Sequence, residues 1–237
     1  MKTGMLITGT DTGIGKTLIT ATLANVWKYR GRSVRVSKPV QSGAAREHPD
    51  GDAYRLQKST DGSETLSHIC PYAFSPPFAP PWAAALLGQK ITMEMVFRSI
   101  QNQFASAPDA FWFIEGVGGF LSPLTEDGTV ADLAQKLALP VLIVSHSSTG
   151  AVNATLLTVE AIRKRDVPIA AIVFNVSHGS YDEYETTHMI DWIETQTSLP
   201  VFGPFPHQKD EQPQTLLNAW LSMPGAEQKA KKVPMFP

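Results

Sequence analysis

A glycine-rich segment near the start of the chain constrains the fold more than any other feature. It reads Gly-Thr-Asp-Thr-Gly-Ile-Gly-Lys-Thr over residues 9–17, directly after the apolar run Met5–Thr8, which predicts a buried strand. The helical spacing of Leu18–Tyr29 predicts a helix directly after the segment. Glycines let backbone N–H groups curl around phosphate oxygens, and a helix start adds a partial positive charge at that point. Lys16 and Thr17 would then reach the outer phosphates and Mg²⁺.

The spacing inside this segment departs from the most common phosphate-binding pattern. Five residues separate Gly9 from Gly15, whereas that pattern has four. The segment also differs from a dinucleotide-binding fingerprint, in which backbone groups alone hold a pyrophosphate and Lys16 and Thr17 would have no role. A turn that binds nothing would not require Gly-Lys-Thr at a helix start. We therefore interpret the segment as a variant phosphate-binding loop.

Short apolar runs and helical segments alternate along the rest of the chain. The runs are rich in Val, Ile and Phe, which is typical of buried parallel strands. They are Val34–Ser37, Phe111–Glu115, Val141–Ser145, Ile169–Asn175 and Val201–Phe202. Helical spacing marks Met93–Phe104, Val130–Leu137, Ala151–Arg165 and Tyr184–Thr195. This order predicts a single α/β domain with a mostly parallel sheet and helices on both faces, and the phosphate loop makes it a P-loop nucleotide hydrolase-like fold.

The composition excludes several classes of protein. The 237 residues, 43% of them hydrophobic, suffice for one packed domain, and a net charge of −2 argues against non-specific binding to nucleic acid. The single Cys70 excludes an internal disulfide framework and a cysteine-rich zinc site. No apolar run approaches the roughly 20 residues of a membrane span, and the first run is too short for a signal peptide. We expect a reduced, cytoplasmic protein without a membrane or nucleic-acid partner.

Three segments fall outside the alternation of strands and helices. Residues 42–51 mix small and charged side chains and predict a loop. Residues 71–81 hold five prolines, which exclude a helix or a central strand there. Residues 224–237 combine lysines with small residues and prolines, so we expect a flexible tail after a domain that spans residues 1–223. Three tryptophans in periodic segments are predicted core residues: Trp27, Trp112 and Trp192.

Two charged residues follow the ends of predicted strands and open short motifs. Lys38 begins Lys-Pro-Val-Gln-Ser-Gly at residues 38–43, and Glu115 begins Glu-Gly-Val-Gly-Gly at residues 115–119. Ligands bind at the carboxyl ends of strands in open α/β sheets, and a buried carboxylate is costly unless it is paired or near a metal. Alone, Lys38 could be a surface lysine and Glu115 a helix-capping acid. The phosphate loop favours a ligand site for both.

Two further sites have two interpretations each, and a third has one. Asp52 lies at a predicted helix start, where it is either an N-cap or a carboxylate of the site. The helix that begins at residues 150–153 is either a plain helix start or a set of backbone donors suited to a carboxylate. Asn175 ends a strand, and its amide offers a donor and an acceptor for base recognition.

These segments occur in the order and approximate spacing of the dethiobiotin synthetases, and the chain resembles that family from Met5 to about Gln208. The most specific matches are the motifs at residues 9–17, 38–43 and 115–119. The five-residue glycine spacing is a trait of that family and supports the resemblance. Gly13 and the Pro-Pro-Trp sequence at residues 80–82 depart from residues that are common there.

The resemblance implies a ligase that uses ATP and Mg²⁺ to close the ureido ring of dethiobiotin from 7,8-diaminopelargonate and CO₂ or bicarbonate. A carbamate and a mixed carbamic–phosphoric anhydride would be the intermediates. Lys16 and Lys38 would be catalytic, because both can neutralise charge on the carbamate and the phosphoryl group. The resemblance also implies a homodimer, in which the substrate carboxylate lies at a helix start of the second subunit.

The resemblance further assigns residues to each ligand. Mg²⁺ would be held by Thr17, Asp52 and Glu115. The diamine and carbamate would contact Thr12, Ser42, Val117, Gly118 and Gly119, and the substrate carboxylate would contact Gly150, Ala151, Val152 and Asn153. ATP would contact Gly13, Ile14, Gly15, Lys16, Thr17, Leu18, Asp52, Glu115, Gly116, Asn175, Pro206, His207 and Gln208.

Two alternative functions remain at this point. A partitioning-type ATPase, in which hydrolysis drives dimer cycling, would carry a second lysine in the position of Asp11 or Thr12 and usually a basic surface. Neither feature is evident in the sequence. An inactive homologue of the synthetase is the other alternative, and Gly13 and the prolines at residues 80–81 are its motivation.

Overall fold

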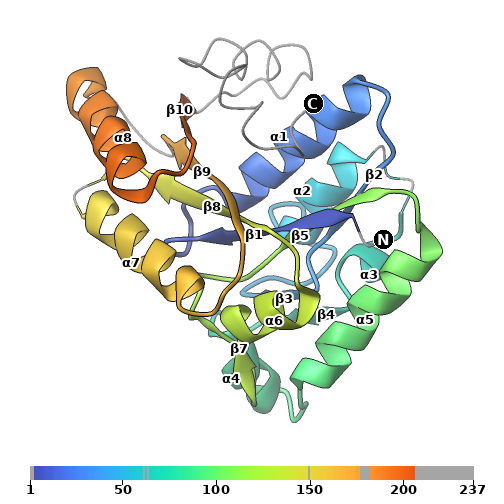
Figure 1. Cartoon of the computed structure of the whole chain (residues 1–237). Coiled ribbons are helices and arrows are strands. Elements are labelled where there is room, and N and C mark those ends of the chain that lie inside the picture. Colours follow the sequence, from blue (N-terminus) through green and yellow to red (C-terminus); the bar gives the residue numbers. More distant parts are fainter. Residues whose placement is uncertain (1–2, 61, 63, 149, 177–181, 206–237) are drawn as a thin grey trace.

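The computed structural model describes residues 3–205 except residues 61, 63, 149 and 177–181. Its main feature is a six-stranded, fully parallel sheet in the order β10-β9-β8-β1-β5-β2 (Figure 1). These strands are β1 (Gly4–Gly9), β2 (Val34–Ser37), β5 (Phe111–Glu115), β8 (Val141–His146), β9 (Ile169–Asn175) and β10 (Val201–Phe205). All six strands predicted from the sequence are therefore confirmed.

Helices cover both faces of this sheet, as predicted. The helices are α1 (Lys16–Tyr29), α2 (Asp52–Ser59), α3 (Leu66–Ile69), α4 (Pro80–Leu86), α5 (Met93–Ser106), α6 (Val130–Leu137), α7 (Ala151–Arg163) and α8 (Glu183–Thr197). Successive side chains of β1 point to opposite faces, so Leu6 belongs to one core cluster and Met5 and Ile7 to the other. The cluster of Leu6 includes residues of α5, α6, α7 and α8, and the cluster of Met5 includes residues of α1, α2 and α3.

The proline-rich segment at residues 71–81 corrects one prediction. It contains β4 (Tyr72–Phe74), which pairs only with β3 (Val40–Ser42) in a separate small sheet, so the exclusion of a central strand is confirmed. The exclusion of a helix is wrong, because α4 begins at Pro80. The first positions of a helix need no N–H donor, so prolines at residues 80 and 81 are compatible with that start.

Two other expectations are settled by the described residues. Trp27 and Trp112 are buried core residues as predicted, whereas Trp192 is 55% exposed and that prediction is wrong. On α8 the buried residues include Ile190 and Ile193, and Trp192 lies on the opposite, solvent side. Residues 43–51 form no helix or strand, in agreement with the predicted loop, although Ser42 ends β3.

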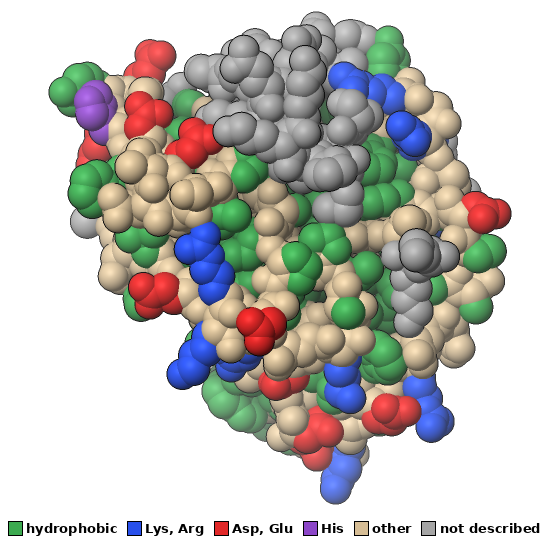
Figure 2. Space-filling model, viewed as in Figure 1, with side chains coloured by type: hydrophobic (Ala, Val, Ile, Leu, Met, Phe, Trp, Pro, Cys, Tyr) green, Lys and Arg blue, Asp and Glu red, His purple; other side chains and the backbone are tan. Residues whose placement is uncertain are grey.

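The strands place their carboxyl ends along one edge of the sheet, and the polar residues singled out from the sequence follow them there. A second small sheet, β6 (Pro123–Thr125) with β7 (Gly128–Thr129), and α4 lie beyond this edge (Figure 1). Acidic and basic side chains are interspersed on the face drawn in Figure 2. None of the helices in the described part of the chain is long and apolar enough to cross a membrane.

Candidate active site

The glycine-rich segment forms a loop that connects β1 to α1. Gly13 and Gly15 have φ values of +73° and +93°, a region that side chains other than that of glycine rarely adopt. A Cβ atom at Gly15 would also lie 2.1 Å from the side-chain nitrogen of Asn175. No side chain caps the start of α1 and its first turn contains no acidic residue. The first N–H groups of α1 are therefore available to an anion.

Lys16, the first residue of α1, lies at this helix start with only 6% of its surface exposed. Its Nζ donates a 2.7 Å hydrogen bond to the backbone carbonyl of Asp11. Burial, together with the positive charge of Lys38, lowers the pKa of Lys16 to about 8. A phosphate group in the loop would supply the negative charge that this buried ammonium lacks.

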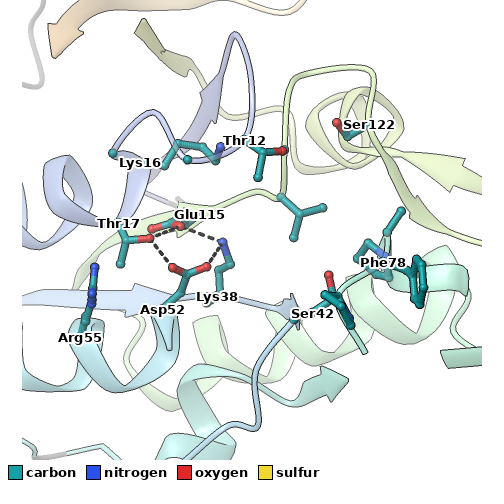
Figure 3. A pocket seen from close by; sticks show the side chains of 18 of the residues that line it. Thr12, Lys16, Thr17, Lys38, Ser42, Asp52, Arg55, Phe78, Glu115 and Ser122 are labelled. Carbon is teal, nitrogen blue, oxygen red and sulfur yellow. Dashed lines mark hydrogen bonds and ion pairs between the residues drawn. The ribbon is translucent and has the colours of Figure 1, made fainter. Parts of the chain in front are cut away.

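Lys38, Asp52, Glu115 and Thr17 form a connected polar cluster beside the loop (Figure 3). The Nζ atom of Lys38 lies 2.8 Å from Asp52 Oδ2 and 2.7 Å from Glu115 Oε1, and it also donates to the carbonyl of Gly116 at 3.0 Å. The Thr17 hydroxyl lies 2.7 Å from Asp52 Oδ1 and 2.8 Å from Glu115 Oε1. The two carboxylates thus each contact both the lysine and the threonine.

The charges of the cluster stabilise one another. Burial alone would lower the pKa of Lys38, but the carboxylates of Asp52 and Glu115 raise it well above the ordinary value. Burial alone would raise the pKa of Asp52, but Lys38 and the hydrogen bond from Thr17 lower it to about 2. Lys38 is therefore a permanent cation at neutral pH, and Asp52 is a permanent anion.

Neighbouring backbone and side-chain contacts fix the position of this cluster. The N–H of Lys38, at the end of β2, donates to the carbonyl of Ile69 at 2.9 Å. Asp52 is the first residue of α2, and the buried Gln41 accepts a 2.9 Å hydrogen bond from the N–H of Ala53. Asp52 is therefore a carboxylate of the site and not the N-cap, which is Gly51.

A cleft of about 690 Å³ brings together most of the residues predicted from the sequence. The predicted residues that line it are Thr12, Gly13, Gly15, Lys16, Thr17, Leu18, Lys38, Ser42, Asp52, Glu115, Val117, Gly118 and Asn175. Ile14 and Gly116 support the cleft through their carbonyls, which accept from Asn175 and Lys38 respectively. The predicted contacts Pro206, His207 and Gln208, and the tail at residues 224–237, lie outside the described residues.

The turn after Glu115 is shaped by its glycines. Gly118 has a φ of +54°, and a Cβ atom there would lie 2.4 Å from the hydroxyl oxygen of Ser122. That oxygen accepts a 2.8 Å hydrogen bond from the N–H of Gly119. Val117 and Gly118 face the cleft, whereas the N–H of Gly119 is already used by Ser122.

Asn175 lies beneath the phosphate loop. It is fully buried, and its Nδ2 donates a 2.8 Å hydrogen bond to the carbonyl of Ile14. Its Oδ1 has no hydrogen-bond partner among the described residues. Asn175 therefore positions the loop and keeps one free acceptor, which leaves its predicted role in base recognition untested.

Residues 150–153 lie outside this cleft. Asn153 instead lines a neighbouring groove of about 510 Å³, which also includes Asp11, Gly119 and the exposed side chains of Leu121 and Leu157. Gly150 has a φ of +88° at the start of α7, and no side chain caps that start. Within one chain, the predicted carboxylate site is thus separate from the cleft that holds Lys16 and Lys38.

The sequence did not indicate one wall of the cleft. Its residues are Arg55, Pro77, Phe78, Ala79, Pro80, Ser122 and Pro123, and they lie with Gly43, which belongs to the motif at residues 38–43. The proline-rich segment supplies more than half of the residues of this wall, and its lack of periodicity was the one available signal. Arg55 and Ser122 line the cleft because α2 and the turn after β5 pack beside it. No local sequence pattern predicts this packing.

Thr17, Asp52 and Glu115 could hold a divalent cation. Glu115 is 1% exposed, and its Oε2 atom has no hydrogen-bond partner among the described residues. A buried carboxylate oxygen without a partner is costly, and a cation would satisfy it. The described residues contain no group of three or more His, Cys, Asp or Glu side chains that could hold a metal. Two carboxylates that both lie within hydrogen-bond distance of one hydroxyl are a donor set that fits Mg²⁺, which takes one or two carboxylates and completes its shell with phosphate oxygens and water.

A phosphate loop on the central strand of a parallel sheet, with a lysine–carboxylate cluster beside it, defines a P-loop nucleotide-binding protein. A protein-family model described as an AAA domain matches residues 3–215. The chain is 37% identical over 215 residues to the ATP-dependent dethiobiotin synthetase BioD of Bacillus subtilis subsp. natto, which covers 91% of this chain and 92% of that one. It is 44% identical over 172 residues to the protein of the same name from Anaeromyxobacter sp. (strain Fw109-5), with 73% and 76% covered. The chain belongs to the dethiobiotin synthetase family.

A solved structure supports the fold alone. The ParA family ATPase from Chlorobium tepidum TLS superposes with a TM-score of 0.53 and 16% identity, over 99% of this chain and 98% of that one. At this identity the likeness extends to the α/β fold, and it carries no argument about activity.

Proposed function

We propose that this ATP-dependent ligase closes the ureido ring of dethiobiotin from 7,8-diaminopelargonate and CO₂, as the names of its relatives and the residues of the cleft suggest. One amine would add to CO₂ and lose a proton, which gives a carbamate. A carbamate oxygen would attack the γ-phosphorus of ATP, and ADP would leave. The second amine would then attack the carbamoyl carbon of the mixed anhydride and lose a proton, and phosphate would leave as the ring closes.

This chemistry needs no nucleophile from the protein. It needs two reactants held in line and positive charge where oxygens become more negative. Lys16 lies at the start of α1, where the phosphates would bind, and Lys38 lies between that point and Ser42 (Figure 3). We assign both lysines to the charge that develops on the carbamate and the transferred phosphoryl group.

The observation that carries the proposal is the cluster of Lys38, Asp52, Glu115 and Thr17 beside the phosphate loop. Mg²⁺ held by Thr17, Asp52 and Glu115 would neutralise the β- and γ-phosphates of ATP. Thr12 and Ser42 would bind the diamine and its carbamate across the cleft from the cluster. The intact cluster argues against the alternative of an inactive homologue, and the lack of a lysine at Asp11 or Thr12 argues against a partitioning-type ATPase.

We also infer a homodimer with composite active sites. Residues 150–153 are outside the cleft of their own chain, and the groove that Asn153 lines is flanked by exposed Leu121 and Leu157. In the dimer, the start of α7 of the second subunit would bind the substrate carboxylate with its uncapped N–H groups. We place the enzyme in the cytoplasm, where ATP is available to it.

A coupled assay tests this function. Purified protein is incubated with diaminopelargonate, bicarbonate, ATP and Mg²⁺, and each component is omitted in turn. The proposal expects ADP and dethiobiotin in equal amounts, with product lost on every omission. ATP turnover that ignores the diamine would contradict it.

Two variants separate binding from chemistry in the same assay. Lys16→Ala should abolish turnover while the protein stays folded, because the loop loses its contact with the phosphates. Lys38→Ala should lower kcat by about 100-fold or more and change ATP affinity far less, because the charge that Lys38 meets is largest in the transition state. Equal losses in kcat and ATP affinity for Lys38→Ala would contradict the assignment.

A further inference from the structure

We infer that Arg55 binds the nucleotide through the phosphates that are not transferred, the α- and β-phosphates. This inference rests on the proposed function, because the proposed reaction determines in which direction ATP lies in the cleft. Arg55 belongs to neither of the motifs that the sequence singled out around Lys38 and Glu115, and it lines the same cleft as both.

The charge of the cleft is the first argument. Among the described residues that line it, the cations are Lys16, Lys38 and Arg55, and the carboxylates are Asp52 and Glu115. Lys38 contacts both carboxylates directly. Three cations against two carboxylates leave the lining of the cleft net positive, and Arg55 is one of the cations that a polyanion would meet.

The position of Arg55 on α2 is the second argument. Asp52, the first residue of this helix, is held by Thr17, and the N–H of Arg55 donates to the carbonyl of Gly51 at 3.2 Å. Residues three apart on a helix share a face, so Arg55 lies one turn along the face that carries Asp52. Figure 3 shows its side chain beside Thr17, on the side of Asp52 away from Ser42 and Phe78.

The direction of the nucleotide follows from the proposed reaction. The γ-phosphate has to face the carbamate, which under the proposed function would lie with Ser42 and Thr12 on the Lys38 side of the cluster. The rest of the phosphate chain then extends toward Thr17, Leu18 and Arg55, which line the other part of the cleft. Arginine suits this position, because its planar fork can donate two hydrogen bonds to one phosphate.

The other contacts of Arg55 leave it available for this role. Its side chain is 57% exposed, and its ion pair with Asp50 is long, at 3.7 Å, with Asp50 itself 80% exposed. Exposed pairs of this kind contribute little to stability. The guanidinium can therefore turn toward a phosphate at small cost.

Equilibrium binding of Mg-ATP and Mg-ADP to the full-length protein tests the inference. We expect Arg55→Gln to lower the affinity for Mg-ATP and for Mg-ADP by the same factor, about tenfold. The reason is that the substitution removes a charge-assisted hydrogen bond to phosphates that both nucleotides share. KM for ATP should rise similarly, kcat at saturating ATP should stay within about twofold, and Arg55→Lys should recover part of the affinity. Asp50→Asn is the matched control, because it breaks the same ion pair and should leave affinity unchanged or slightly tighter.

Three results would overturn the inference. Unchanged affinity for ADP in Arg55→Gln would mean that Arg55 does not touch these phosphates. Loss of affinity for ATP but not ADP would place Arg55 at the γ-phosphate instead. An equal loss in Asp50→Asn would assign the effect to the local fold. If the wild-type protein forms dethiobiotin in the coupled assay, the proposed function stands whichever of these results appears; a wild-type protein that binds no ATP would remove the function itself.

Discussion

At the scale of one residue, the environment of Lys16 in the free protein is suited to binding an anion. Its ammonium is almost completely buried and contacts a backbone carbonyl, and its pKa is lowered to about 8. A bound phosphate would favour the charged form and raise this pKa again. Nucleotide binding should therefore be coupled to proton uptake by Lys16.

The sign of this coupling gives a prediction. Well below pH 8, Lys16 is already protonated in the free protein, so nucleotide binding takes up few protons. Well above pH 8, the free protein has lost this proton and must regain it when the nucleotide binds. From the pKa of about 8, uptake of about 0.1 proton at pH 7 and about 0.9 proton at pH 9 follows, and affinity falls as the pH rises through that range. Calorimetric titration with Mg-ATP in buffers of different ionisation enthalpy measures the uptake.

The variant Lys16→Arg is the control for that measurement. Arginine keeps its charge over the whole range, so uptake should be close to zero at both pH values. Persistent uptake at pH 9 in this variant would assign the proton to another group and contradict the account of Lys16.

The sequence indicated most of the residues of the site but not how they are held. Lys38 and Glu115 were recognisable because charged residues at the ends of apolar strands are costly without a ligand or partner. Three contacts were not recognisable from the sequence: the cap that Gln41 provides for α2, the contact of Asn175 with the loop and the hydrogen bond of Ser122 in the glycine turn. The contacts of Gln41 and Asn175 each join separate segments of the chain that the fold brings together, so no spacing rule encodes them.

At the scale of elements, a buried side chain of α5 connects β2 to α3. Gln103 is 2% exposed; its Oε1 accepts a 2.7 Å hydrogen bond from the Ser37 hydroxyl, and its Nε2 donates to the carbonyl of His68. Ser37 directly precedes Lys38, whose own N–H binds the carbonyl of Ile69 in α3. Gln103 therefore helps to hold together the two elements that carry the backbone of Lys38.

This arrangement predicts a loss of stability for Gln103→Leu. The substitution removes the partner of the buried Ser37 hydroxyl and of the partly buried His68 carbonyl, which costs about 1–3 kcal/mol. Urea denaturation measures the free energy of unfolding. Gln101→Leu, at an exposed position of the same helix, should change it by less than about 0.5 kcal/mol. Equal values for the two variants would show that the buried contacts of Gln103 contribute nothing.

The long elements were predictable and the short ones were not. The strands of the main sheet are short runs rich in Val, Ile and Phe, and α5, α6, α7 and α8 show apolar periodicity. The predicted ends of these elements therefore differ from the observed ends by only a few residues. The small sheet of β3 and β4 and the helices α3 and α4 are too short to show a period. At α4 the prolines concealed a helix, because the same residue that breaks a helix interior is accommodated in its first turn.

At the scale of the whole molecule, the start of α7 lies outside the cleft of its own chain. The proposal that two chains together form each active site can therefore be tested with mixed dimers. A Lys16→Ala chain lacks the nucleotide contact, and an Asn153→Asp chain carries a negative charge where the substrate carboxylate would bind. In a mixed dimer, one of the two sites would receive both defects and the other neither. Activity should therefore recover to about half of the wild-type value per dimer.

Heterodimers purified with two different affinity tags provide the measurement, and the two homodimeric variants are the controls. No recovery in verified heterodimers would place the complete site within one chain. Recovery in a preparation that sediments as a monomer would equally contradict the composite site.

The transfer of oxygen tests the central claim most directly. If a carbamate oxygen attacks the γ-phosphorus, an oxygen atom that enters as ¹⁸O-labelled bicarbonate must leave in inorganic phosphate. Mass spectrometry of phosphate from a reaction with diaminopelargonate, Mg²⁺ and ATP should find one ¹⁸O atom per phosphate released. Phosphate that carries an oxygen from the solvent instead would show that this cleft hydrolyses ATP with water, and the account would be wrong.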